Sequence, residues 1–254
     1  MLSPSSLHFL LFYLLITLAT IAQAVLKATN ARFRDVGEEK RRLIAFMFAV
    51  LVAKMLLFAL LVPVLRAIIL AQEWDSKLAT DAVYGAHLMA VTYLFDMIYR
   101  RVNILVWVHH TLAIGACLVI IWCINPDVPD VARVWLSIPT IFAGIGVGIT
   151  DLGGDVAVLL FYLAPQIVAT SHMIHLCAQF IILGRVAVWS LVFTDISRGH
   201  WRELELNLPS YTLVGGVLLC WGWAQLDNIY VVLGLEEKVR SRAAAGKDER
   251  SKKS

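Results

Sequence analysis

The sequence is poor in charged residues. Lys, Arg, Asp and Glu make up 16% of the 254 residues, whereas a soluble domain carries about 25%. Hydrophobic residues make up 59%, and they are gathered in runs of about 20, a length that crosses a bilayer as a helix. The alternating pattern of a membrane β-barrel is lacking. The composition therefore predicts an all-α, polytopic transmembrane helical bundle without a sizeable soluble domain.

The chain also lacks a strong excess of either charge. Its net charge is +3, and its basic residues lie in the joints between apolar runs and in the tail, where they set the orientation of the spans. We therefore expect no nucleic-acid partner. Cysteines are few, lie inside apolar runs and show no CxxC spacing, which favours small buried hydrophobic residues over a disulfide frame or a zinc site. They are Cys117, Cys123, Cys177 and Cys220.

The apolar runs predict about seven spans. The first run ends in Ala22-Gln-Ala24, which resembles a signal-peptidase site. No positive charge precedes this run and no exported domain follows it, so we expect an uncleaved first helix. The predicted spans are 7–25, 43–70, 84–99, 104–122, 134–149, 169–193 and 211–235.

Residues 156–168 could form an eighth span if they crossed the membrane as a separate helix. About 13 residues rise only about 20 Å, against an apolar core of about 30 Å. Seven spans also place the basic connector 27–42, the Arg100-Arg101 joint and the basic tail on one side, as the positive-inside rule prefers. We predict seven spans with a cytosolic tail, and 156–168 as a bent, re-entrant or interfacial continuation of the fifth.

This topology divides the chain into three parts. Residues 1–42 form the first helix and a basic cytosolic connector, 43–235 form the main transmembrane domain, and 236–254 form a tail that is low in hydrophobicity and predicted to be disordered.

Ionisable side chains inside the apolar runs are the main functional signal. A charged group at the centre of a membrane helix costs roughly 2.5 kcal/mol or more, so it usually faces a protein interior or a wet cavity. Lys54 fits either a position facing the bundle or a solvated, locally paired lysine. Seven further residues from four spans share the cytosolic leaflet, which predicts a polar chamber open to the cytosol. They are Asp96, His109, His110, Asp151, Asp155, His172 and His175.

Local spacing leaves alternatives for each group. His109 and His110 differ by about 100° around a helix, so at most one points straight into a chamber, and a structural interhelical hydrogen bond is the other interpretation. Asp151 and Asp155 share a helical face, but Gly153-Gly154 weakens a continuous helix, and a capped polar helix end stays open. Residues His172 and His175 also fit interfacial histidines that bind headgroups or water.

A catalytic metal is not predicted. Membrane di-iron enzymes need HxxxH and HxxHH boxes, and the chain has only seven histidines, of which His8, His87 and His200 are scattered. A histidine beside a carboxylate makes a general base without a metal. The Gly144-x-Gly146-x-Gly148 motif is no dinucleotide fingerprint because it lies in a membrane run. Small residues at this spacing instead let helices approach closely.

Three motifs resemble the TLC-domain family of multispanning membrane proteins, named for translocation-associated, longevity-assurance (ceramide synthase) and ceroid-lipofuscinosis members. They are Tyr93-Leu-Phe-Asp96-Met-Ile-Tyr99, His109-His110-Thr111-Leu112 and Asp151-Leu-Gly-Gly-Asp155. The resemblance covers about residues 40–235. It implies a bundle of six or seven helices in the endoplasmic reticulum membrane that handles or senses lipids. The tail motif Arg250-x-Lys252 resembles a dibasic retrieval signal for that compartment.

The catalytic branch of this family joins a fatty acyl group from acyl-CoA to a sphingoid amine. By resemblance, His109 and His110 would be catalytic, together with the acidic pair Asp151 and Asp155. The chain departs from the synthase motif, however. Thr150 precedes the first aspartate, one extra residue separates the pair, Gly154 replaces a serine, and Val158, Leu159 and Leu160 stand where a glutamate would fall.

The resemblance is therefore closer to the non-synthase members. It implies a protein of lipid homeostasis, with sphingolipids as the first candidates, that binds or senses lipid in the chamber, where Asp96, His172 and His175 are candidate lining residues. The alternative is an acyl-CoA-dependent N-acyltransferase, with acyl-CoA as co-substrate and no other cofactor. Whether the protein is an enzyme stays open. Membrane lipids are the expected partners, and homo-oligomerisation is left open.

Overall fold

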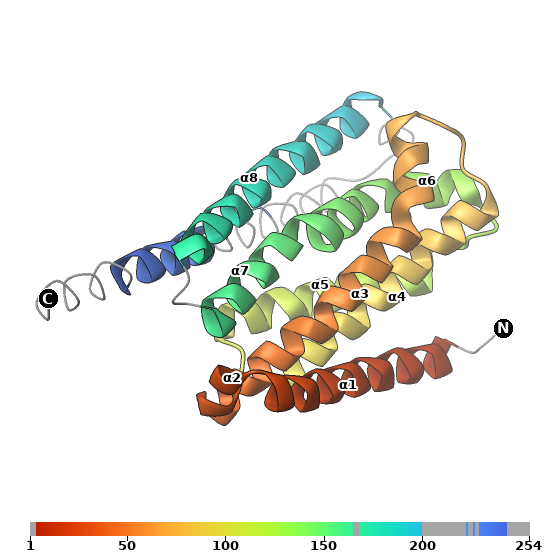
Figure 1. The fold of residues 1–254 in the computed structure, drawn as a ribbon. Helices are drawn as coiled ribbons and strands as arrows, with labels where there is room; N and C mark the ends of the chain where they lie inside the picture. The colour runs from red at the N-terminus through yellow and green to blue at the C-terminus, as the bar shows by residue number, and fades with distance from the viewer. Residues whose placement is uncertain (1–3, 165–167, 200–221, 223–225, 227–228, 243–254) are drawn as a thin grey trace, which may run out of the picture.

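The computed structural model describes residues 4–164, 168–199, 222, 226 and 229–242, and every regular element within these ranges is a helix. Figure 1 shows the long helices lying side by side as a bundle. The prediction of an all-α helical bundle is confirmed. In chain order the elements are α1 (Pro4–Thr29), α2 (Ala31–Asp35), α3 (Glu38–Ile69), α4 (Ser76–Tyr99), α5 (Ile104–Cys123), α6 (Pro129–Ile141), the π-helix η1 (Phe142–Thr150), α7 (Asp151–Leu163) and α8 (Val168–Ser197).

Within the described residues, five helical stretches are long and apolar enough to cross a membrane. They are Ser6–Thr29, Glu38–Ile69, Val106–Cys123, Pro129–Leu163 and Ala169–Ser197. The chain is thus a multi-pass membrane protein. Helix α4, which corresponds to the predicted third span, is not in this set, but it packs against both α3 and α5. Most of the predicted span 211–235 lies outside the described residues, so the count of seven spans stays a prediction.

Elements α6, η1 and α7 follow one another without a break. Together they form one helical stretch of 35 residues, which is about 50 Å long if each residue rises about 1.5 Å. Residues 156–163 therefore continue the fifth predicted span and do not begin a separate one. Asp151 and Asp155 lie in α7, which stays helical through Gly153-Gly154.

The glycines of η1 allow a close approach to α3. A Cβ atom on Gly144 would lie 2.7 Å from Leu65 Cδ1, and one on Gly148 would lie 3.2 Å from Phe58 Cβ. Any larger residue at Gly144 would require Leu65 to move. The prediction that these small residues serve helix packing is confirmed, and the contact fixes the position of α7, which follows directly.

Side-chain caps set where α4 and α5 begin. Asp75 Oδ1 accepts a hydrogen bond from the Leu78 N–H at 2.8 Å, and Asn103 Oδ1 accepts one from the Val106 N–H at 2.8 Å. Such caps satisfy N–H groups that have no partner inside the helix. The start of α5 at Ile104 places the histidine pair in its second turn.

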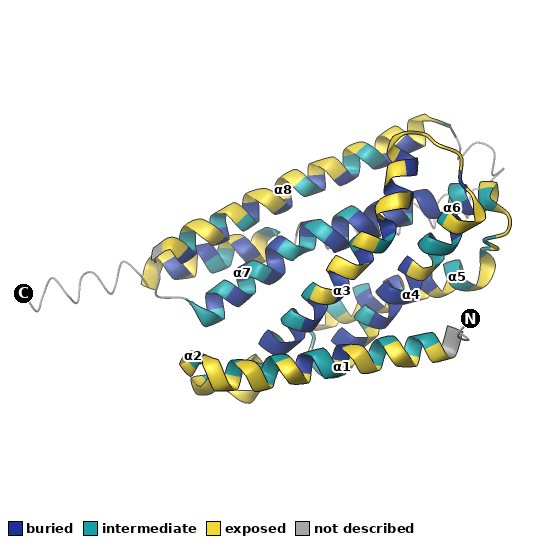
Figure 2. Cartoon of the chain, turned by 45° about the vertical axis from the view of Figure 1, so that its right-hand side comes forward, coloured by how far each residue is buried: buried dark blue, intermediate teal, exposed yellow. Residues whose placement is uncertain are grey.

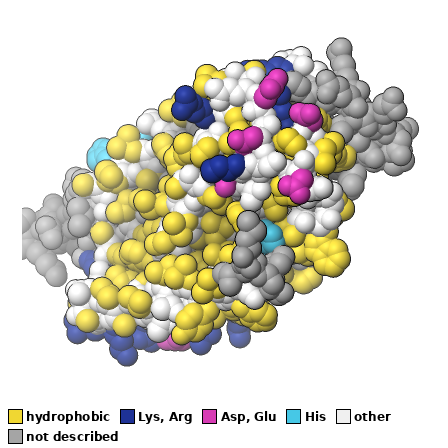
Figure 3. Space-filling model, turned by 90° about the vertical axis from the view of Figure 1, so that its right-hand side faces the viewer, with side chains coloured by type: hydrophobic (Ala, Val, Ile, Leu, Met, Phe, Trp, Pro, Cys, Tyr) yellow, Lys and Arg dark blue, Asp and Glu magenta, His cyan; other side chains and the backbone are white. Residues whose placement is uncertain are grey.

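Burial follows the bundle arrangement. In Figure 2 the buried faces of α3, α4 and α7 point toward one another, whereas α1 and α8 carry broad exposed faces. Figure 3 faces the end where α3 joins α4. It shows acidic and basic side chains gathered near the top of the view, Lys and Arg side chains along its lower edge, and hydrophobic side chains over much of the area between.

Candidate functional site

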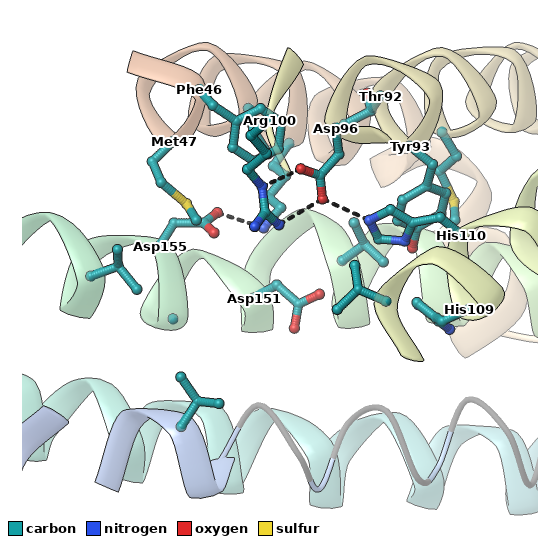
Figure 4. Close-up of a pocket in the computed structure, with 18 of the residues that line it drawn as sticks. Phe46, Met47, Thr92, Tyr93, Asp96, Arg100, His109, His110, Asp151 and Asp155 are labelled. Carbon is teal, nitrogen blue, oxygen red and sulfur yellow. Dashed lines mark hydrogen bonds and ion pairs between the residues drawn. The ribbon is translucent and has the colours of Figure 1, made fainter. Parts of the chain in front are cut away.

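A cavity of about 640 Å³ lies between α3, α4, α5, η1, α7 and α8. We call this cavity the chamber. Its lining includes five of the seven residues that the sequence predicts to meet (Figure 4): Asp96, His109, His110, Asp151 and Asp155. Polar groups from three separate helices thus share one cavity, as the depth argument from the sequence predicts.

Asp96 is the centre of the first polar cluster. Its Oδ2 atom lies 2.7 Å from His110 Nε2 and accepts a hydrogen bond from Arg100 Nη2 at 2.8 Å. Arg100 Nε also donates to Oδ1, so the guanidinium binds both carboxylate oxygens. Figure 4 shows Asp96 between Arg100 and His110. This arrangement compensates the charge of a buried carboxylate by a two-point ion pair and orients the imidazole.

The two adjacent histidines have different surroundings. His110 is buried, its ring lies 4.6 Å from the Tyr93 ring, and its Nδ1 atom is buried without a hydrogen-bond partner. His109 is only half-buried and touches the edge of the Tyr93 ring, with centroids 5.9 Å apart. Both rings line the chamber, but among the described contacts only His110 meets a carboxylate. This matches the expectation that neighbouring histidines diverge around the helix.

Lys54 and Asp155 form the second cluster. The Lys54 Nζ atom lies 2.5 Å from Asp155 Oδ2, and both side chains are buried. Of the two interpretations of Lys54, the position facing the bundle is therefore the observed one. A buried charge is tolerated when it is paired in this way.

Asp151 pairs with Arg185 of α8 in the third cluster. Arg185 is buried and lines the chamber, and the sequence prediction did not include it. The available signal was a lone arginine in the middle of the apolar run 169–193. Arg100 was likewise assigned only to orientation, although its side chain folds back into the chamber.

His172 and His175 lie away from the chamber. His172 is exposed on α8. His175 Nδ1 lies 3.1 Å from Glu236 Oε2, and its Nε2 lies 3.1 Å from the side-chain nitrogen of Gln179. Neither histidine is part of the described lining. Counting residues predicts only their depth, and α8 turns a different face, that of Arg185, toward the chamber.

Chemically, the chamber combines apolar walls with three paired carboxylates. Among the described residues that line the chamber, only Asp96 and His110 form a carboxylate–imidazole pair in which the second ring nitrogen has no hydrogen-bond partner, which is the form of a general base. Within the described ranges, no group of three or more His, Cys, Asp or Glu side chains is placed to hold a metal ion.

Comparison with protein-family models, characterised proteins and solved structures finds no match to this chain. The TLC-domain resemblance therefore stays a prediction that rests on the three motifs. In the structure, all three motifs contribute residues to the chamber: Tyr93 and Asp96, His109 and His110, and Asp151 and Asp155.

Proposed function

We propose that this protein binds or senses a membrane lipid in the chamber and acts in lipid homeostasis as a TLC-domain type protein of the endoplasmic reticulum membrane, with sphingolipids as the first candidates. The observation that supports the proposal most directly is the cavity itself, which lies inside a membrane bundle and is lined by apolar side chains together with three carboxylates in ion pairs. Such a cavity suits a ligand that has both a chain and a polar headgroup.

The size and walls of the chamber support a lipid ligand. Its volume of about 640 Å³ lies within the roughly 300–1,000 Å³ of typical ligand pockets. Apolar side chains form most of the lining, among them Phe46, Val50, Met89, Phe142 and Val158. An acyl chain that moves from the bilayer to these walls passes between two apolar surroundings, so it enters without a desolvation cost.

The pairing of the charges supports binding over acid-base catalysis. Asp155 is held by Lys54, Asp151 by Arg185, and Asp96 by Arg100 and His110. A carboxylate oxygen that already accepts from a cation is less available to take a proton from a substrate. It can still accept a hydrogen bond from a hydroxyl or amide of a headgroup.

The position of the chamber supports a cytosolic-leaflet ligand. The lining includes Leu43, which directly follows the basic connector 27–42, and Arg100, which belongs to the Arg100-Arg101 joint. The positive-inside rule assigns both basic segments to the cytosol.

A pair of valines on α7 offers a direct test. Val158 lines the chamber, whereas Val156 on the same helix does not, and both are half-buried. We expect Val158→Trp to fill the cavity and remove a lipid that co-purifies with the wild-type protein, measured by native mass spectrometry and lipid extraction. Val156→Trp is the control and should keep it. An unchanged lipid content in the Val158→Trp protein would argue against a lipid in the chamber.

A second function, N-acylation by acyl-CoA, is favoured by one observation. Within the described part of the chain, the buried Nδ1 atom of His110 has no hydrogen-bond partner, while Asp96 lies against its Nε2. Such an imidazole could take a proton from a long-chain amine while the amine nitrogen bonds to the acyl carbon of acyl-CoA. The carbon–sulfur bond of acyl-CoA then breaks, and the proton passes from the imidazole to the CoA thiolate.

The two functions separate in a complementation experiment. Lipid composition is measured in a strain that lacks the protein and is complemented with wild type or with His109→Ala/His110→Ala, and acyl transfer from labelled acyl-CoA to a sphingoid amine is measured in microsomes. Transfer that His110→Ala abolishes supports the enzyme. Full rescue by the double variant without any transfer eliminates it.

A further inference from the structure

Three side chains of α5 belong both to the chamber lining and to the outer surface. Ile104, Val108 and Leu112 are 71%, 44% and 53% exposed, and all three line the cavity. They are spaced four residues apart, so they form one stripe along a single face of the helix. The stripe is about 12 Å long at about 1.5 Å per residue.

A fourth exposed residue lies on the helical segment 229–242. Val231 is 48% exposed and also lines the chamber. Among the described elements, α5 packs mainly against α4. In a bilayer, an exposed apolar side chain on a spanning helix faces lipid tails. The chamber wall formed by α5 is thus also a lipid-facing surface.

Polar groups stand at one end of this stripe. Arg100 and Asn103 precede Ile104 in the chain, and both line the chamber. The Arg100 side chain is partly exposed while its carboxylate partner Asp96 is buried, so the guanidinium keeps an accessible edge. Arginine and asparagine N–H groups donate to oxygen-rich headgroups. The stripe therefore begins beside the hydrogen-bond donors Arg100 and Asn103, at the predicted cytosolic surface, and extends toward the hydrocarbon core of the bilayer.

We infer that the chamber opens sideways into the bilayer along Ile104, Val108 and Leu112, and that the acyl chain of a cytosolic-leaflet lipid passes there while its headgroup lies at Arg100 and Asn103. This inference rests on the proposed function and adds the route and orientation of the ligand. A water-soluble ligand that arrives from the cytosol would gain nothing from an apolar stripe that faces lipid tails.

Photolabelling in vesicles tests the route. The purified full chain is reconstituted in phosphatidylcholine vesicles that contain a trace of phosphatidylcholine with a diazirine in one acyl chain, and the labelled residues are located by mass spectrometry. Asp151 and Asp155 line the chamber, and Asp155 is buried, so lipids that merely surround the protein do not reach it. We expect wild type to carry label on these carboxylates.

Two tryptophan substitutions at the stripe and one matched control complete the experiment. Val108→Trp and Leu112→Trp should each abolish the interior label by closing the opening. Val119 lies on the same face of α5, is 61% exposed and is not part of the described lining. Val119→Trp should therefore keep the label, and elution as a single species in gel filtration confirms that each variant is folded.

The outcomes distinguish the route from the function. Wild type without interior label contradicts the proposed lipid ligand itself. Interior label that survives both Val108→Trp and Leu112→Trp, or that Val119→Trp removes equally, leaves the lipid ligand in place and overturns the sideways route.

Discussion

At the scale of single residues, the chamber depends on pairs that join distant parts of the chain. Lys54 and Asp155 are separated by 101 positions, yet their side chains meet inside the bundle. Removing one partner of a buried ion pair leaves an uncompensated charge, whereas replacing both by apolar groups removes the desolvation penalty together with the attraction. The pair should therefore respond very differently to single and double substitution.

We predict that Asp155→Asn lowers the free energy of unfolding by about 3–5 kcal/mol, because Lys54 stays buried without its counter-charge. The double variant Lys54→Met/Asp155→Leu should recover most of this loss. Thermal unfolding of the purified proteins in detergent measures both. The exposed pair Lys77–Asp81 is the control, and Asp81→Asn should change stability by less than about 1 kcal/mol. Equal losses of unfolding free energy for Asp155→Asn and Asp81→Asn would show that the Lys54–Asp155 pair is accessible to water.

The chamber was only partly predictable from these residues. The depth of each ionisable group follows from its count along a span, which is why Asp96, His110 and Asp155 were expected to meet. Which face a helix turns inward depends on packing against its neighbours, and residue counting does not contain that information. For this reason Arg185 was missed and His172 and His175 were assigned to a chamber that they do not line.

At the scale of elements, helix contact decides which glycines are required. Gly144 in η1 lies against Leu65, whereas Gly115 in α5 has no heavy atom within 4 Å of an added Cβ. The sequence alone indicates that Gly144 and Gly115 both lie in apolar runs. Only Gly144 belongs to a regularly spaced glycine motif, and this spacing predicts that it lies at a helix contact. The nine-residue π-helix itself had no sequence signal that we recognised.

We expect Gly144→Ala to destabilise the protein by about 1–3 kcal/mol, since the new methyl group would overlap Leu65 in a filled core. Gly115→Ala should instead stabilise it by up to about 1 kcal/mol, because alanine favours the helix and meets open space. The two variants can be compared in the same thermal unfolding experiment. A Gly144→Ala protein as stable as wild type would mean that η1 and α3 are less tightly packed than described.

At the scale of the whole molecule, the charge distribution sets the orientation. Seven spans place the basic connector 27–42 and the tail on the same side, with residues 124–128 between α5 and α6 on the other. Among the described residues, four of the six predicted spans before 211 correspond to single helical stretches long and apolar enough to cross a membrane, and the fifth continues into α7, whereas α4, the predicted third span, is not in this set. The third and the last predicted spans therefore await a direct measurement.

Glycosylation tags provide that measurement. A tag inserted at Asp127 should be modified in the endoplasmic reticulum, because the α5–α6 connection is predicted to face the lumen. A tag at the tail should remain unmodified, and a shift in gel mobility reports each case. Modification of the tail would contradict the seven-span topology with a cytosolic tail.

The π-helix has a consequence for how the chain tolerates changes in length. In η1 the backbone hydrogen bonds join residues five apart instead of four, so each of its turns holds about one more residue than an α-helical turn. Deleting one residue between 142 and 150 can be absorbed when such a turn tightens to an α-helical one, whereas inserting one residue is expected to rotate everything that follows by about 100° relative to α6. Asp151 and Asp155 would then leave Arg185 and Lys54, although no residue of the chamber had been changed. The length of this segment is thus as much a part of the site as its side chains.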